Sequence, residues 1–239
     1  MKNQTMQQFA PSSLKNGYLK LAFSILFLFL VISACKKDKP SGSPSQPIAI
    51  NGIPGSPITI NGNSYPTVKI GTQVWTTINY NGPGGIDATT PNDPKYGKLY
   101  TIDEAKTAAT SLTDGYRLPT QNDFLKLFQS QGGKHITGES GSDIQGDNVK
   151  RLMATDGWET PGTGTNTSGF NAYPDSPMTP TYANFWTTTP VDGTISQLFY
   201  ARVYYNIEGT NGTVKGQKGY FVAGDPDNKL SIRFVKDVQ

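Results

Sequence analysis

Side chains with oxygen ligands are concentrated in one short segment of the 239-residue sequence. The segment reads Asp225-Pro226-Asp227-Asn228, so two carboxylates and one amide lie close together. Calcium in proteins binds about six to eight oxygen atoms, and such a group can begin a site. Asp, Pro and Asn are also favoured in ordinary turns for backbone reasons. Asp225, Asp227 and Asn228 are therefore candidate calcium ligands, with a plain turn as the alternative, and no other cofactor is expected.

Aromatic side chains form a second group with a chemical use, because a ring can stack on the C–H face of a sugar. Tyr200 and Tyr204 are expected on the polar face of a strand, so they are candidates for an exposed binding surface. Trp186 is a third candidate. Exposed tyrosine pairs also stabilise sheets, and tryptophans also fill cores, so a structural role is the alternative for all three.

Catalytic groupings are scarce in this sequence. One His and one Cys exclude paired-His motifs, multi-Cys metal sites and internal disulfides. The histidine, His135, follows a predicted helix end, where a cation interacts favourably with the helix dipole. No Gly-x-Ser-x-Gly elbow, phosphate-binding loop or dinucleotide fingerprint occurs. The protein is not expected to be an enzyme, although two distant carboxylates that hydrolyse a glycan remain a third alternative.

The single cysteine, Cys35, follows a segment that predicts export. Residues 1–34 contain three lysines, no acidic residue and an apolar run over residues 21–32. This run is shorter than the ~20 residues that span a bilayer, and its basic, apolar, small order is that of a signal peptide. The sequence Ile-Ser-Ala before Cys35 resembles the processing site of bacterial lipoproteins. That resemblance implies acyl chains such as palmitate on Cys35, and several chains anchor stably in a membrane. An uncleaved signal anchor is the alternative.

Charge and location follow from this signal peptide. Without residues 1–34 the chain keeps 18 basic and 18 acidic side chains, so its formal net charge is zero. A neutral chain offers no basic surface for nucleic acid, and we expect no such partner. We expect an outer membrane lipoprotein displayed at the cell surface, with the periplasmic face as the alternative.

Composition divides the rest of the chain into a linker and one domain. Pro, Gly and Ser are frequent over residues 35–57, which predicts an extended spacer. Residues 58–239 are enough for one hydrophobic core. Residues 47–52 (Pro-Ile-Ala-Ile-Asn-Gly) are nearly repeated at 57–62, and each copy predicts a short strand closed by an Asn-Gly turn. We interpret the first copy as spacer and the second as the start of the domain.

Helix and strand signals together favour an α+β fold. Thr101 and Glu104 form a capping box that begins one helix, and Thr120 caps another that ends at the glycines 132 and 133. A short third helix is expected over residues 148–154. Strands are expected over residues 68–75 (a hairpin turning at Gly71), 198–207, 220–223 and 230–235. In the strand 198–207, alternate residues predict a buried face made of Phe199, Ala201, Val203, Tyr205 and Ile207.

Seven segments occur in an order that resembles a known family. They are 67–75 (TVKIGTQVW), 96–100 (YGKLY), 116–120 (YRLPT), 152–158 (LMATDGW), 166–174 (NTSGFNAYP), 185–189 (FWTTT) and 230–237 (LSIRFVKD). Over residues 59–237 the chain resembles the Fibrobacter succinogenes major paralogous domain, which is frequent in lipoproteins and secreted proteins of Bacteroidetes and Fibrobacteres. The chain departs from the family where two cysteines are common, and it has Tyr116 and Phe234 in those regions.

The resemblance implies a C-type-lectin-like fold, with two or three helices flanking a small antiparallel sheet below long loops. Formylglycine-generating enzymes are similar in fold, but their chemistry needs redox-active cysteines, and Cys35 is expected to carry lipid. The family has no established activity or binding site, so no functional residue is carried over. The Glu-Pro-Asn and Trp-Asn-Asp motifs of calcium-dependent lectins are absent from the sequence.

These features lead to an expected function. We expect a lipid-anchored binding or adhesion module of the cell envelope, which presents loops to an extracellular glycan or protein. The alternative is a structural or accessory subunit of a surface assembly, such as a fimbrial tip or a polysaccharide-uptake complex.

Overall fold

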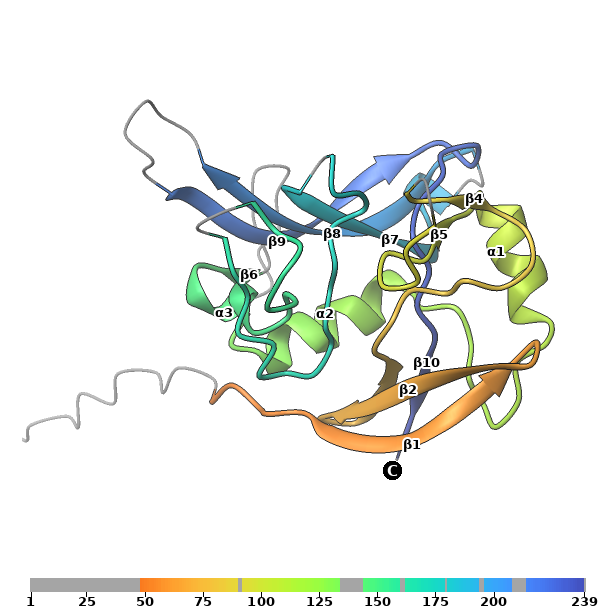
Figure 1. Ribbon diagram of the computed structural model, residues 1–239, viewed down its shortest axis with the longest axis horizontal. Helices are drawn as coiled ribbons and strands as arrows, with labels where there is room; N and C mark the ends of the chain where they lie inside the picture. The colour runs from red at the N-terminus through yellow and green to blue at the C-terminus, as the bar shows by residue number, and fades with distance from the viewer. Residues whose placement is uncertain are drawn as a thin grey trace, which may run out of the picture. The chain divides into compact units, whose positions relative to one another are not determined.

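The structure of the protein, a computed structural model, describes residues 48–89, 92–133, 144–159, 162–178, 180–193, 196–207 and 214–238 (Figure 1). Helices and small antiparallel sheets are mixed in this domain, which confirms the predicted α+β class. The predicted signal peptide, Cys35 and His135 lie outside the described residues. No helix among the described residues is both long enough and apolar enough to cross a bilayer.

Two four-stranded antiparallel sheets form the frame of the domain. The first sheet has the order β1-β2-β3-β10, and the second has the order β6-β9-β8-β7. A two-stranded ribbon, β4-β5, precedes the helices. The strands are β1 (Ile53–Ile60), β2 (Asn63–Ile70), β3 (Gln73–Thr76), β4 (Ile86–Asp87), β5 (Lys98–Leu99), β6 (Ile144–Gln145), β7 (Tyr182–Pro190), β8 (Leu198–Ile207), β9 (Val214–Gly224) and β10 (Val235–Asp237). The helices are α1 (Ile102–Ala109), α2 (Gln121–Ser130), α3 (Asp147–Lys150) and the 3-10 turn η1 (Val191–Gly193).

The first sheet confirms the predicted hairpin and corrects the predicted start of the domain. β2 and β3 are joined by a turn in which Gly71 has a φ of 59°, a conformation that glycine adopts without strain. However, β1 already begins at Ile53, which pairs with Lys69. The backbone N–H of Ile50 also donates to the carbonyl of Ser130, at 2.8 Å. The boundary expected at residue 58 is therefore too late, because the end of the predicted linker is part of the fold.

Both main helices begin where the capping signals predict. Thr101 and Glu104 form the expected capping box of α1, and Thr120 with Asp123 forms a second one on α2. Asp123 also accepts two hydrogen bonds from Arg117, at 2.6 and 2.9 Å, so the start of α2 is tied to the preceding turn. The third helix is shorter than expected and begins one residue earlier.

The second sheet contains one strand that the sequence pattern predicts and one that it does not. β8 has the expected bounds, and β9 is much longer than the expected 220–223. Of the expected strand 230–235, only Val235 falls in β10, whereas Leu230 and Ser231 form isolated bridges. β7 is not predicted, since most of its residues are buried on both faces and therefore lack the polar–apolar alternation of a half-buried strand.

Two buried clusters hold the sheets and helices together. In the first cluster, α2 packs against one face of β7 and β8, and Figure 1 shows α2 beneath these strands. The predicted inward residues Ala201, Val203 and Tyr205 belong to this cluster. The second cluster joins the first sheet and α1 to the opposite face of the second sheet at one end, through residues that include Val74, Ile102, Trp186, Leu198 and Tyr200.

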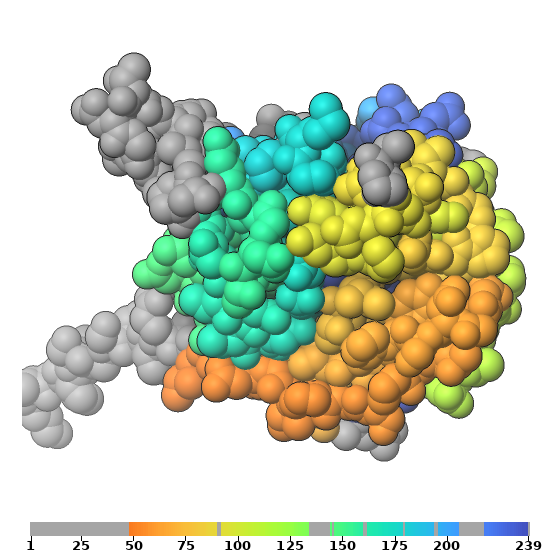
Figure 2. Space-filling model, viewed as in Figure 1, coloured from red at the N-terminus to blue at the C-terminus, as the bar shows by residue number. Residues whose placement is uncertain are grey.

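Long connections form much of one side of the domain. Figure 2 shows residues 77–97 (yellow) and 151–178 (green to teal) spread across the side that faces the viewer. They need internal polar partners, because buried backbone groups without hydrogen bonds are costly.

Arg233 supplies such a partner from the interior of the domain. Its side chain is completely buried, and it donates to the carbonyls of Thr76, Phe170 and Asn171 and to Oδ1 of Asn79, at 2.7 to 2.9 Å. The guanidinium carbon lies 5.4 Å from the ring centroid of Phe185 in β7. Burial lowers the pKa of Arg233 to about 9, which still leaves the group charged at neutral pH. One side chain thus connects two loops, the C-terminal segment and the second sheet.

We expect Arg233→Met to lower the free energy of unfolding by about 3–5 kcal/mol, because four buried acceptors lose their donor. Urea unfolding of the variant and of the unchanged protein measures this loss. Lys106→Met, which removes an exposed ion pair on α1, is the control and should cost less than about 1 kcal/mol. Equal losses in the two variants would show that Arg233 does not organise the loops.

Candidate functional site

The face of the second sheet opposite α2 carries a set of polar and aromatic side chains. Strand register places Asn184, Arg202 and Tyr220 in one row across β7, β8 and β9. The next row contains Tyr182, Tyr204 and Lys218. We call these six residues together with Tyr200 the tyrosine–arginine face. Tyr182, Arg202, Tyr204 and Tyr220 are half-buried and belong to neither buried cluster.

Arg202 is at the centre of this face and is held by its neighbours. Its Nε donates to Oδ1 of Asn184 at 2.7 Å, and one terminal nitrogen donates to the Tyr200 hydroxyl at 3.0 Å. The other terminal nitrogen is 3.5 Å from the Tyr220 hydroxyl. The guanidinium carbon lies 4.9 Å from the ring centroid of Tyr182, a distance suited to a cation–π interaction. These contacts hold the guanidinium in one orientation among the rings.

A buried carboxyl lies behind Asn184 and orients it. Both the backbone N–H and the side-chain Nδ2 of Asn184 donate to the carboxyl oxygens of Asp175. Asp175 is 8% exposed and belongs to the connection before β7, where its own N–H donates to the carbonyl of Tyr182. Desolvation raises the pKa of Asp175 to about 7, despite the hydrogen bonds from Asn184 and the nearby charge of Arg202, which both act to lower it. Such a perturbed group beside an array of functional side chains is typical of a site.

The predicted aromatic candidates have different fates. Tyr204 is half-buried on the tyrosine–arginine face, where its ring meets Tyr220 at 6.4 Å between centroids. Tyr200 was expected to be exposed, but it is only 7% exposed. Gly224 on β9 lies so close that a Cβ there would be 2.9 Å from the Tyr200 ring. Trp186 is fully buried and donates to the carbonyl of Tyr100 at 2.8 Å, so the proposal that it stacks on a sugar is wrong in this structure.

The predicted calcium ligands lie in a turn after β9. The N–H of Asn228 donates to the carbonyl of Asp225 at 3.0 Å, and Asp225, Asp227 and Asn228 are all exposed. Oδ1 of Asp225 is 3.4 Å from Nε2 of Gln197. Among the described residues, no three His, Cys, Asp or Glu side chains gather closely enough to hold a metal ion. The structure therefore adds no third acid to this pair, and calcium binding stays a prediction.

Sequence reasoning missed most of the tyrosine–arginine face. Alternation along β8 placed Arg202 beside Tyr200 and Tyr204, so that residue had a signal. Asn184, Tyr182 and Tyr220 had none, because their places depend on pairing between strands that are distant in sequence. Asp175 could not be found either, since its pKa depends on burial by the fold.

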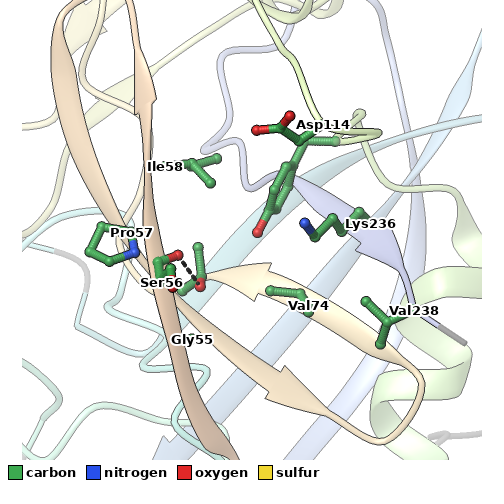
Figure 3. Close-up of a pocket in the computed structure, with 10 residues that line it drawn as sticks. Gly55, Ser56, Pro57, Ile58, Val74, Asp114, Lys236 and Val238 are labelled. Atoms are coloured by element: carbon green, nitrogen blue, oxygen red, sulfur yellow. Dashed lines mark hydrogen bonds between the residues drawn. The ribbon is translucent and has the colours of Figure 1, made fainter.

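A separate hollow lies beside the first sheet. A bulge between Gly55 and Ile58 in β1 leaves a cavity of about 320 Å³, near the lower limit of small-ligand pockets. Figure 3 shows Ile58 on one side of it and Lys236 on the other. The Lys236 ammonium lies 4.7 Å from the ring centroid of Tyr116, which repeats on this sheet the cation–π contact made by Arg202.

The pKa of Asp175 makes stability depend on pH in a defined direction. Because the pKa is about 7 in the folded protein and about 3.8 unfolded, the folded state holds an extra proton between these values. The stabilisation is complete below about pH 4 and is lost as pH rises through 7. We expect Asp175→Asn to remove this decline, which is on the order of 4 kcal/mol. Urea unfolding from pH 4 to 8 measures it.

An exposed carboxyl provides the matched control for this experiment. Asp103→Asn on α1 should keep the decline with pH, because the Asp103 side chain is 84% exposed. An undiminished decline in Asp175→Asn would assign the pH dependence to another group.

Comparison with known proteins gives one match. A sequence model of the Fibrobacter succinogenes major domain matches residues 68–236, which include every residue of the tyrosine–arginine face. No curated protein and no solved structure matches the chain significantly. Since the matched segment covers well over half of the sequence, the chain belongs to the Fibrobacter succinogenes major domain family.

Proposed function

We propose that this protein is a binding module of the cell envelope, and that the tyrosine–arginine face is its binding surface for an extracellular glycan or protein. The observation that carries the proposal is the row of half-buried rings around Arg202 on a sheet face that α2 does not cover. An acylated Cys35 would anchor the chain in the outer membrane, with the domain displayed at the cell surface.

The arrangement of the face suits binding for a physical reason. Binding costs less entropy when the side chains are already ordered, and Tyr and Arg are the residues most often responsible for binding energy. Arg202 is held by Asn184 and Tyr200, and the rings of Tyr204 and Tyr220 meet edge to face. The partner would therefore meet a surface that needs little rearrangement.

The finer fold assignment is also part of the proposal. We infer the C-type-lectin-like fold from family membership. The two main helices, the small antiparallel sheets and the long connections support it.

The alternative function, a subunit of a surface assembly, receives less support from the sheet edges. Strand addition needs a free edge, and β1 is the outer strand of the first sheet. Pro54 and Pro57 lie within β1, and the bulge between Gly55 and Ile58 interrupts its pairing. Prolines and bulges are features that protect edge strands against added chains. An assembly would therefore have to form through side chains.

Alanine variants test the binding surface. We expect Tyr204→Ala and Tyr220→Ala each to weaken binding to the best ligand on a glycan and envelope-protein array by about tenfold, since each removes a contact ring. Tyr204→Phe should keep most of the affinity, because the ring remains. Affinity is measured by titration of the purified full chain.

Lys236→Ala is the control for surface location, because Lys236 makes a similar cation–π contact on the other sheet. Its affinity should equal that of the unchanged protein. Full affinity in both tyrosine variants, with urea unfolding unchanged, would place the binding surface elsewhere.

A further inference from the structure

We propose that the tyrosine–arginine face binds an anionic saccharide, with the acidic group on Arg202 and the sugar ring against the tyrosines. This inference rests on the proposed binding function and names the class of its ligand. Three properties of the face lead to it: unused donors on Arg202, the sign of its charge and the absence of a free backbone edge.

Arg202 retains hydrogen-bonding capacity toward a ligand. A guanidinium has five N–H donors. The described residues accept three hydrogen bonds from it, on Asn184, Tyr200 and Tyr220, and the last of these is long. No carboxylate among the described residues forms an ion pair with Arg202. An anionic oxygen would use the remaining donors in charge-assisted hydrogen bonds, which are stronger than neutral ones.

The face is positive where it meets solvent. Lys218 is exposed in the row next to Arg202, so two cations belong to the face itself. The acid nearest to them is Asp175, which is buried behind Asn184 and bonds to that residue. Its desolvation holds the pKa near 7, so at neutral pH it neutralises Arg202 only in part. An anionic ligand is therefore favoured over a neutral one.

The strand pairing favours a saccharide over an acidic peptide. Extended peptides usually bind by adding a strand to a free sheet edge. Arg202 and Tyr204 belong to β8, which pairs with β7 on one side and β9 on the other. The main chain of β8 is thus already used, and recognition must come from side chains. Tyrosine rings with a guanidinium between them offer flat faces for a sugar ring and donors for its acidic group.

Binding of defined polysaccharides to the full chain tests the proposal. The probes are polygalacturonate, alginate and hyaluronate as carboxylated polymers, dextran sulfate as a sulfated one, and dextran and carboxyl-reduced polygalacturonate as neutral ones. We expect at least one anionic polymer to bind tenfold or more tightly than the neutral polymers, and to weaken as salt is raised from 50 to 500 mM (about a threefold shorter Debye length). A carboxylated and a sulfated ligand are told apart by which polymer binds.

Arginine variants connect this binding to the face. Arg202→Met should lose binding tenfold or more, and Arg202→Lys should lose less, since it keeps the charge but not the planar fork. Lys236→Met, which removes a cation from the other sheet, should bind as the unchanged protein does. Urea unfolding of each variant identifies any loss of fold, and Arg202→Lys decides the result if Arg202→Met fails to fold.

The possible failures are distinguishable. Preference for neutral polymers, or equal binding of polyglutamate, would overturn the anionic saccharide while leaving the binding function intact, provided that Tyr204→Ala still weakens it. An absence of binding to every anionic polymer would overturn the proposal as well. Full anionic binding in both Arg202 variants would overturn the assignment of the ligand to this face.

Discussion

The buried guanidinium of Arg233 is the constraint on which the rest of the domain depends. A charge that leaves water needs a complete set of hydrogen-bond partners, or its burial costs many kcal/mol. Here the partners are three backbone carbonyls and Oδ1 of Asn79, and no carboxylate takes part. Since the fork of the guanidinium is planar and rigid, the acceptors must lie in fixed places. The loops that contribute them are ordered together, and the adjacent Phe185 ring links them to the second sheet.

A second arginine shows what the same group does at a surface. Arg233 is completely buried and every one of its contacts is internal, whereas Arg202 is half-buried and is held from one side by Asn184 and Tyr200. The difference comes from position in the sheets. Arg233 lies where two loops and two sheets meet, while Arg202 lies on a sheet face that no described helix packs against. The first arrangement stabilises the fold, and the second leaves donors directed at the surroundings.

The errors made from sequence have a common physical origin. Alternation along β8 correctly separates its two faces, so Ala201 and Val203 were predicted as core. It cannot show whether another part of the chain covers the outer face, and one end of that face is covered. Tyr200 and Trp186 were therefore expected to be available, although they pack in the second cluster. The predicted start of the domain failed similarly, because Ile53 is ordered by pairing with Lys69 and not by its own neighbours in sequence.

Local signals in the sequence determined the capping boxes, the turn at Gly71, the bounds of β8 and the family. Each depends on residues a few positions apart, whose backbone geometry is set by short-range hydrogen bonds and sterics. Only the tertiary structure decided the row of Asn184, Arg202 and Tyr220 and the burial of Asp175 behind it. Strand register and desolvation are set by segments that meet only after folding, and no local pattern in the sequence encodes them.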